Sequence, residues 1–439
     1  MKRKVLLTAA TGLFALGGSL GIAAPAFASP AFTPPPGCTG SWNTTQAAVH
    51  NHAPGTSSGC LVAEVRGAMP GTSAVASAQG IPNTGLGPFG PQAQEHAVFV
   101  QTDNAAGNQV VAYDQVPNGT LTLAGTYDTG GLGGAQMEPP GLSDHLSSQG
   151  SLAYDPVSGN LYAVNAGSNT VSVFSVRGDE LSLRQVIGSG GVFPASVAVH
   201  GDLVYILNSL HGGSVQGYYS SSGHLVPISG SNRSLGLTIP NDTTQFIKTP
   251  GQVAFSPDGS QLILTTKMNG NDVDVFTVRP SGNLSATPVK NSEPGTGPFA
   301  ETFDQARHLV VANVVNDSLA TYRLNANGTV SLIDSVGTGQ VATCWVTPAG
   351  RFFYTANTGS NSMSRFAHSF SGQLTFQGDT STDPNPQDAS ATPDGRFLYV
   401  QTGAKGIVDE FRVNQNGSLT EIGSVTVARA VGGEGIVAS

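Results

Sequence analysis

Short runs of alternating hydrophobic and polar residues, separated by turn sequences, follow one another from residue 96 to the C-terminus. Four stretches show this pattern most clearly: DPVSGNLYAVNAGSNTVSVFSV (155–176), SPDGSQLILTT (256–266), TPAGRFFYTANTGSNSMSRF (347–366) and TPDGRFLYVQT (392–402). Each begins with a turn that contains proline and glycine and continues into a β-branched and aromatic run. The longer ones add a second polar turn and another alternating run. This order predicts strands joined by hairpins.

A tight glycine-containing turn followed by leucine or valine predicts a fourth strand in every unit, and it occurs seven times. The leucine or valine stands at Leu121, Leu181, Leu225, Leu284, Val330, Leu374 and Leu419. The polar residue that ends the second strand also recurs seven times, at Thr102, Asn165, Asn208, Thr266, Asn313, Asn357 and Thr402. Four-stranded units of about 40–50 residues are typical of propeller blades. The sequence therefore predicts an all-β fold, a seven-bladed β-propeller.

The two ends of the repeat region complement each other. The C-terminal segment 433–439 has the pattern of an inner strand, whereas the first unit begins at its second strand, at 96–100. We therefore predict that the C-terminal strand completes blade 1, which removes an open sheet edge from the ring. A frayed C-terminal tail is the alternative.

The N-terminus has the features of an export signal. Lys2, Arg3 and Lys4 precede an apolar run that ends at Ala26-Phe27-Ala28. Such a segment predicts a signal peptide over residues 1–28 and a secreted, extracellular protein, with an uncleaved membrane anchor as the alternative.

Residues 29–95 form a Pro/Gly-rich N-terminal extension before the propeller, which is predicted over 96–439. Because export supplies oxidising conditions, Cys38 and Cys60 are expected to form a disulfide in this extension. Cys344 lies in an apolar strand and is expected to be a buried free thiol.

Charge and composition limit the partners. Only 11% of residues are charged, and loss of the three basic residues of the signal takes the formal net charge from -9 to -12. An acidic surface argues against nucleic acid and anionic lipid. No later run reaches the roughly 20 apolar residues that span a bilayer, so no membrane insertion is expected. The expected partner is a small molecule or an extracellular protein, bound by a monomer.

Two long connections between blades fall on one face of the predicted ring. Residues 128–150 join blades 1 and 2, and residues 229–250 join blades 3 and 4. Long, chemically varied loops on a rigid scaffold are common binding sites, although these loops would also cover the apolar end of the ring. The candidate ligand-binding residues on this face are Glu138, Asp144, Gln252, Lys267, Gln387 and Glu434.

The sequence contains no H-E-x-x-H, paired C-x-x-C or phosphate-binding glycine loop, so neither a metal nor an organic cofactor is expected. A polar cluster at Asn269, Asn271, Asp272 and Asp274 has calcium-ligand chemistry. Aspartate and asparagine are also favoured in turns between strands, and this second interpretation is preferred here.

The turn S/T-P-x-G-x-x-L-Y before the second strand and G-x-L before the fourth resemble the lactonase family of seven-bladed propellers, which includes 6-phosphogluconolactonase and muconate-lactonising enzymes. The resemblance covers residues 96–439 and implies lactone hydrolysis by His, Arg and Glu at the mouth of the ring. The matching positions of this chain hold other residues: Gly251 or Gln252, Phe299-Ala300, Val314 and Gln387. Acid–base chemistry and oxyanion binding need the groups that are replaced.

Two functions follow from this comparison. The first is a lactonase-like propeller that has diverged from hydrolysis and binds a ligand or protein at its loop-rich face. The second is a lactone hydrolase or cycloisomerase with a rebuilt acid–base set. The residues available for that set are Glu301, Asp388, Lys267, Lys405 and His145, which are otherwise ordinary surface polar residues. Convergence of titratable groups in one pocket on that face would favour the enzyme.

Overall fold

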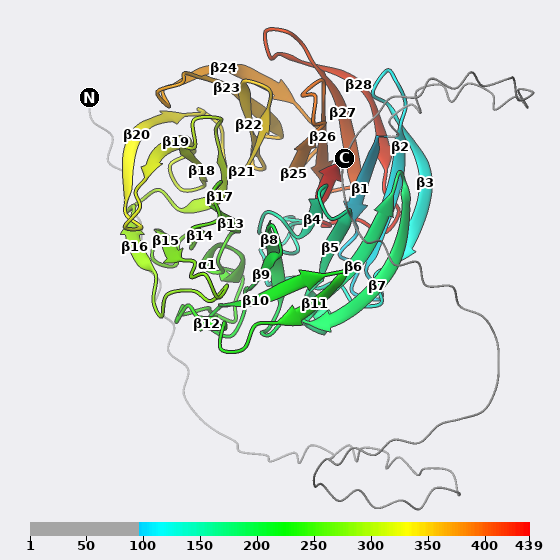
Figure 1. The fold of residues 1–439 in the computed structure, drawn as a ribbon. Coiled ribbons are helices and arrows are strands. Elements are labelled where there is room, and N and C mark those ends of the chain that lie inside the picture. Colours follow the sequence, from blue (N-terminus) through cyan, green and yellow to red (C-terminus); the bar gives the residue numbers. More distant parts are fainter. Residues whose placement is uncertain (1–95) are drawn as a thin grey trace, which may run out of the picture. The chain divides into compact units, whose positions relative to one another are not determined.

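The computed structural model describes residues 96–439, which form seven four-stranded antiparallel sheets arranged in a ring (Figure 1). This confirms the all-β, seven-bladed propeller predicted from the repeats. The predicted signal peptide, the N-terminal extension and the Cys38–Cys60 disulfide lie outside the described residues.

Blade 1 contains β29 (Ile436–Ala438), β1 (Ala97–Gln101), β2 (Gln109–Gln115) and β3 (Leu121–Asp128). Blade 2 contains β4 (Leu152–Asp155), β5 (Asn160–Asn165), β6 (Thr170–Arg177) and β7 (Glu180–Gly188). Blade 3 contains β8 (Pro194–His200), β9 (Leu203–Asn208), β10 (Ser214–Ser221) and β11 (His224–Pro227), with β12 (Arg233–Ser234) also paired to β10. Blade 4 contains β13 (Val253–Phe255), β14 (Gln261–Thr265), β15 (Asp272–Thr277) and β16 (Val289–Ser292).

Blade 5 contains β17 (Pro298–Phe303), β18 (Leu309–Asn313), β19 (Ser318–Leu324) and β20 (Val330–Gly337). Blade 6 contains β21 (Thr343–Ala349), β22 (Phe352–Asn357), β23 (Ser362–His368) and β24 (Leu374–Ser381). Blade 7 contains β25 (Pro386–Ala391), β26 (Phe397–Thr402), β27 (Ile407–Val413) and β28 (Leu419–Thr426).

The C-terminal strand closes the ring, as predicted from the two ends of the repeat region. Strand β29 pairs antiparallel with β1, in a register that places Phe99 opposite Val437. Beyond the strand, the Ser439 amide donates to the carbonyl of Ala97 at 2.9 Å. The inner edge of blade 1 is therefore covered by the last residues of the same chain, and Figure 1 shows the two ends of the described chain side by side.

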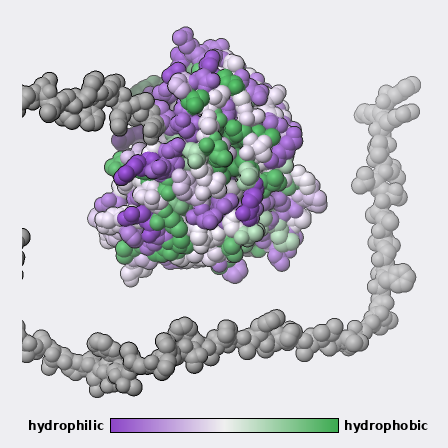
Figure 2. Space-filling view, turned by 90° about the vertical axis from the view of Figure 1, so that its right-hand side faces the viewer, coloured by the Kyte–Doolittle hydropathy of each residue, from purple (hydrophilic) through white to green (hydrophobic). Residues whose placement is uncertain are grey.

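Burial along the strands explains why the sequence pattern changes across each blade. The second strands, such as β5, β22 and β26, are buried at every position because both of their faces pack against neighbouring blades. Outer strands such as β3 and β24 alternate between more and less exposed positions. The hydrophobic core therefore lies between the blades. Hydrophilic and hydrophobic residues are interspersed on the face shown in Figure 2.

Blade 4 departs from the predicted pattern. Its fourth strand was expected to begin at Leu284, but β16 begins at Val289, and Leu284 forms only an isolated bridge with Val278. The second long connection contains a single turn of helix, α1 (Gln245–Lys248). Among residues 96–439, no helix is long and apolar enough to cross a membrane.

Candidate functional site

The two long connections meet over one end of the ring. The Met137 amide donates to the side chain of Gln245 at 3.0 Å, and the Ser147 hydroxyl donates to the carbonyl of Phe246 at 2.9 Å. A third bond joins the Thr249 hydroxyl to Gln136 at 2.8 Å. The two connections, which are about 100 residues apart in sequence, are thus hydrogen-bonded to each other and form one cover over this end of the ring.

Lys267 fastens this cover to the ring. Its backbone lies in the left-handed region (φ 51°), two residues beyond β14, and its side chain has no exposed surface. The ammonium group donates to the Ser147 carbonyl (2.6 Å), the Thr249 hydroxyl (2.9 Å) and the carbonyl of Phe246. Its three protons are therefore used within the protein. Burial lowers the pKa of Lys267 to about 8, although Asp144 and Glu434 oppose this shift.

Asp144 and Glu434 form a hydrogen-bonded pair of buried carboxyl groups beside Lys267. The Ser148 amide and hydroxyl donate to Glu434 at 3.1 and 3.0 Å, and the Ser147 amide donates to Asp144 at 2.9 Å. Burial raises the pKa of both groups, and the charge of Asp144 raises that of Glu434 further. A carboxyl group beside another carboxyl group is harder to ionise, so the proximity of Asp144 favours the protonated form of Glu434.

Other carboxyl groups surround this pair. Asp103 is buried and accepts the Glu434 amide at 2.7 Å, and Glu138 accepts the Asp144 amide at 2.9 Å. Burial raises the pKa values of Asp103, Glu138 and Asp388 to about 7. This end of the ring therefore holds several acids that change charge near neutral pH.

A cavity of about 330 Å³ lies at this end of the ring, beneath the two connections. Its lining residues are Pro139, Pro140, Gly141, Leu142, Asp144, Ser147, Phe246, Ile247, Phe299, Val314, Ala342, Cys344, Thr358, Gly359 and Asn385. Most of these side chains are apolar, and Asp144 is the only ionisable carboxyl group among them. Small-molecule sites typically combine an apolar wall with a few polar groups in this way.

The structure brings some of the sequence-predicted residues to this site and leaves others apart. Asp144, Lys267, Glu434 and Glu138 converge, whereas Glu301, Asp388 and Lys405 do not form one cluster. Lys405 is exposed and lies 3.7 Å from Asp383 in an ion pair.

Glu301 and Asp388 are buried on inner strands, so they are not surface residues. Both carboxylate oxygens of Glu301 lack a hydrogen-bond partner among residues 96–439, and burial raises its pKa well above the usual value. Asp388 accepts the amide of Ala389 at 2.9 Å. Its charge raises the pKa of Glu434, so Asp388 acts on the pair from outside the cavity lining.

The remaining candidates have structural contacts. The ring of His145 packs against Gly432, and burial lowers the pKa of this histidine. Gln387 donates to the carbonyl of Ser143, and Gln252 accepts the amide of Glu301 at 2.6 Å. Cys344 is buried, as predicted, and forms no disulfide within residues 96–439, where it is the only cysteine.

Metal binding finds no support in the described part of the chain, where no group of three or more His, Cys, Asp and Glu side chains is placed to hold an ion. Within the turn cluster, Asp272 instead accepts the Ser292 hydroxyl at 2.5 Å and lies 3.9 Å from the Lys290 ammonium.

Asp103 is the functional-site residue that the sequence interpretation missed. It follows Thr102, the polar residue that ends the second strand of blade 1, just as Lys267 follows Thr266 in blade 4. Both residues have left-handed backbones, with φ values of 49° and 51°. Superposition of the repeats at this position would have identified Asp103, because the equivalent residue of blade 4 was already a candidate.

The family assignment rests on most of the propeller. The sequence profile of the family described as "Lactonase, 7-bladed beta-propeller" matches residues 132–432. The chain belongs to this family. Among curated relatives, 6-phosphogluconolactonase of Yersinia enterocolitica is 24% identical over 179 residues, which cover 37% of this chain and 53% of the relative. The chain thus matches about half the length of these curated relatives.

Solved structures show the same lactonase-family fold. The periplasmic gluconolactonase of Pseudomonas aeruginosa aligns with a TM-score of 0.61 at 18% identity and covers 78% of this chain and 98% of that protein. A protein from Lactobacillus plantarum aligns with a TM-score of 0.60 at 20% identity, with 79% and 98% coverage. Identities this low support a shared fold and leave the chemistry to be argued from the site.

Proposed function

We propose that this lactonase-family propeller hydrolyses an uncharged, largely apolar lactone in the cavity at the end of the ring. The observation that carries the proposal is the Asp144–Glu434 carboxyl pair, of which Asp144 lines the cavity. A pair that shares one proton presents a carboxylate and a carboxylic acid at the same place. Ester hydrolysis uses a base and then an acid, and such a pair supplies both.

In the proposed reaction, the Asp144 carboxylate accepts a proton from water as the water oxygen bonds to the lactone carbonyl carbon. The carbonyl oxygen becomes negatively charged. When the tetrahedral intermediate collapses, the ring C–O bond breaks and the leaving oxygen takes the proton from Asp144, which gives a hydroxy acid and restores the pair. Glu434, fully buried, is a positioning residue that keeps its own proton directed at Asp144.

Asn385 is the candidate donor to the developing oxyanion. Asn385 lines the cavity. Its backbone amide donates to the Asn361 side chain at 3.0 Å, whereas its side-chain amide makes no hydrogen bond with any residue from 96 to 439. One preorganised amide donor of this kind is worth about 10²–10³-fold in rate where it has been removed from other enzymes.

The lining also supports the substrate class. Within the part of the chain that the structure describes, no Arg or Lys lines the cavity, and the nearby Lys267 already uses its three protons. Phe299 and Val314 lie where the family resemblance implies Arg and Glu. A phosphorylated lactone would place its charge against an apolar wall and the Asp144 carboxylate, which is unfavourable. The signal-like N-terminus supports an extracellular source for the substrate.

Ligand binding without turnover is the second candidate function. The observation that favours it is the lack of a free cation on the described cavity wall, since oxyanion stabilisation in acyl transfer is commonly the largest catalytic contribution.

Lactone turnover by the purified chain tests the two functions. We expect hydrolysis of an alkyl-substituted δ-lactone above the spontaneous rate, and near-background hydrolysis of 6-phosphogluconolactone. Asp144→Asn should lower kcat by about 10² or more, because it removes the general base. Asp409→Asn is the matched control, since Asp409 is a buried carboxyl with a pKa raised by burial to about 6 and lies on β27, outside the cavity lining.

The outcomes separate the possibilities. Loss of activity in Glu301→Gln but not in Asp144→Asn would move the base to Glu301 and refute the proposed mechanism. Saturable binding of the alkyl lactone, seen by calorimetry without any turnover, would establish the binding function instead. Preference for the phosphorylated lactone would contradict the proposed substrate class.

A further inference from the structure

Three of the seven blade-to-blade interfaces are closed in the same way on the face opposite the cavity. The first residue of the second strand packs against the glycine of the third hairpin in the next blade. A Cβ atom on Gly282, Gly417 or Gly119 would lie 2.8, 2.7 or 2.1 Å from the side chains of Leu203, Phe352 and Phe397, respectively. A large apolar side chain therefore fills the gap between these blades.

A tyrosine two residues further along the second strand secures the same interfaces. Tyr205, Tyr354 and Tyr399 each donate a hydrogen bond to the carbonyl of that glycine, at 2.6, 2.6 and 2.7 Å. The apolar side chain that fills the gap and the tyrosine hydrogen bond together hold the third hairpin of one blade against the second strand of the blade before it.

The interface between blades 2 and 3 lacks both features. Asn160 occupies the position of Leu203, Phe352 and Phe397. The closest atom to a Cβ on the facing Gly223 is the Asn160 Oδ1, at 3.5 Å.

The tyrosine at this interface also bonds differently. The Tyr162 hydroxyl pairs with the Ser220 hydroxyl at 2.9 Å, and it does not reach the Gly223 carbonyl. A groove of about 660 Å³ is therefore left between the two blades.

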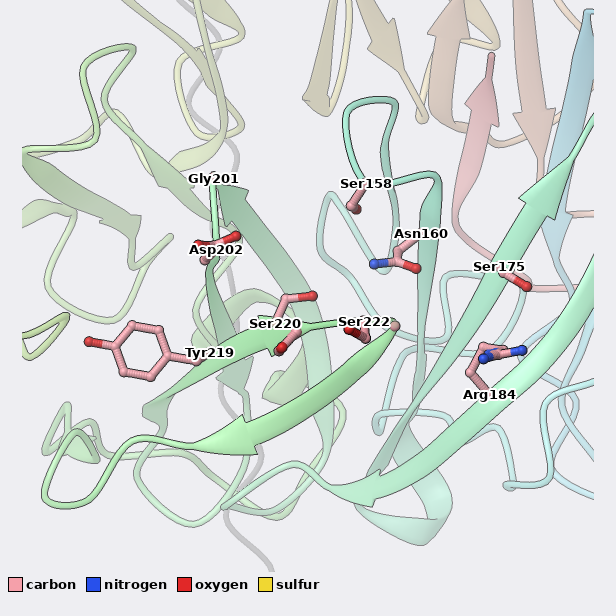
Figure 3. A pocket seen from close by; sticks show the side chains of 11 residues that line it. Ser158, Asn160, Ser175, Arg184, Gly201, Asp202, Tyr219, Ser220 and Ser222 are labelled. Carbon is pink, nitrogen blue, oxygen red and sulfur yellow. The ribbon is translucent and has the colours of Figure 1, made fainter. Parts of the chain in front are cut away.

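Several polar side chains that line the groove have no hydrogen-bond or ion-pair partner among residues 96–439. Its lining residues are Ser158, Asn160, Ser175, Arg184, Gly201, Asp202, Tyr219, Ser220, Ser221, Ser222 and Gly223. Figure 3 shows Asn160 between two sets of side chains, with Arg184 and Ser175 to one side and Ser220 and Asp202 to the other.

Asn160 is the strongest indication of a ligand. It is only 4% exposed, yet its Oδ1 accepts no hydrogen bond from any residue between 96 and 439. Arg184 and Asp202 are exposed and belong to none of the ion pairs found in that range. Asn160 lines the groove, so its amide oxygen is available to accept a hydrogen bond from a polar occupant.

We propose that this groove is a second binding site and that it takes a neutral saccharide segment. A sugar hydroxyl both donates and accepts, so neighbouring hydroxyls can satisfy the acceptor-only Asp202 and the donor-only Arg184 at the same time. An anion would be repelled by Asp202, and a cation by Arg184. The serine hydroxyls and Asn160 add further donors and acceptors, and Tyr219 offers a partly exposed ring. The volume is within the range of small-molecule sites.

Titration of the mature chain with maltotriose, cellotriose and triacetylchitotriose, followed by calorimetry or NMR, tests the site. At least one of these neutral trisaccharides should bind saturably below about 10 mM. Asn160→Phe should remove this binding, because it fills the gap as Phe352 and Phe397 do in their blades. Arg184→Ala should weaken binding about 10-fold through loss of charge-assisted hydrogen bonds. Arg323→Ala, an exposed arginine on blade 5, is the control and should bind as the parent chain does.

Thermal melting shows whether each variant is folded, and Asn160→Leu replaces Asn160→Phe if the larger ring does not fit. The site is refuted if none of the three trisaccharides binds, or if binding is unchanged in both Asn160 variants. Saturable binding of inorganic phosphate or glucuronate in place of the neutral sugars would refute the ligand class. Because the groove and the cavity lie on opposite faces, Asn160→Phe should leave lactone turnover unchanged, so the two proposals fail separately.

Discussion

Replacement of Asp103 by asparagine measures how much a buried ionisable carboxyl group lowers the free energy of unfolding of this propeller. The Asp103 carboxylate accepts the Glu434 amide at 2.7 Å and the side-chain amide of Gln101. Asparagine keeps one oxygen for the Glu434 amide. Its new NH₂ group faces the Gln101 amide, which can turn over so that Oε1, buried without a partner among the described residues, accepts the hydrogen bond. The left-handed backbone at this position (φ 49°) also suits asparagine. The hydrogen bonding is thus preserved while the ionisable group is removed.

The expected magnitude follows from the pKa. Burial raises the pKa of Asp103 to about 7, against about 3.9 in an unfolded chain. A group whose folded pKa is raised contributes stability in acid, which is lost as the pH rises from about 4 to about 7. Each pKa unit is worth about 1.4 kcal/mol, so the two units between pH 5 and pH 7 amount to about 3 kcal/mol at most. Asparagine does not ionise, so the Asp103→Asn variant does not lose this stability as the pH rises.

Urea unfolding of the parent chain and of Asp103→Asn at about pH 5 and about pH 8 gives the comparison. We expect the free energy of unfolding of the variant to rise relative to the parent by about 2 kcal/mol between the two pH values. Asp128→Asn, at an exposed position, is the matched control. An equal difference for Asp103→Asn at both pH values would refute the argument that burial raises the pKa of this acid.

Three further changes test the packing of the ring. Tyr354→Phe should lower the free energy of unfolding by about 1 kcal/mol because it removes the hydrogen bond to the Gly417 carbonyl, and a denaturant titration that finds no loss would contradict this contact. Removal of residues 436–439 should expose the edge of β1 and cause association or unfolding, seen by size-exclusion chromatography, whereas a stable monomer would show that β29 is dispensable. Lys267→Met should leave the Ser147 carbonyl without a partner among the described residues and remove one hydrogen bond to the Phe246 carbonyl, at a cost of about 3 kcal/mol and with faster proteolysis of the two long connections; an unchanged digestion pattern would rule out the fastening role.

The sequence predicted the number of blades and the closure of the ring because both depend on short-range chemistry. Alternation with a period of two residues defines a strand, and glycine turns such as Asn416-Gly417 define the hairpins between strands. These signals repeat seven times, so a weak fourth strand such as that of blade 4 did not affect the count. The segment 433–439 has the pattern of an inner strand. Blade 1 lacked an inner strand of its own, so the segment was expected to pair there.

The site was accessible to sequence analysis only in part. Asp144, Lys267 and Glu434 were candidates because they lie near strand ends on the loop-rich face, which strand order determines. Their pairing was not predictable, because Ser148 and Glu434 are 286 residues apart and the long connections have no periodicity that places their side chains. Lys405 also lies just after a second strand, β26, but its side chain is exposed to solvent.

Local pattern therefore determined the strands, hairpins and order of blades in this protein, since each of these is decided within a few residues of chain. Only the tertiary structure decided which buried acids lie together, that the Lys267 ammonium already donates to groups of the protein, and that a groove is open beside Asn160 between blades 2 and 3. These properties depend on burial and on contacts between distant segments. Removal of water raises the pKa of a carboxyl group, and these groups lose their contact with water only when the ring has closed.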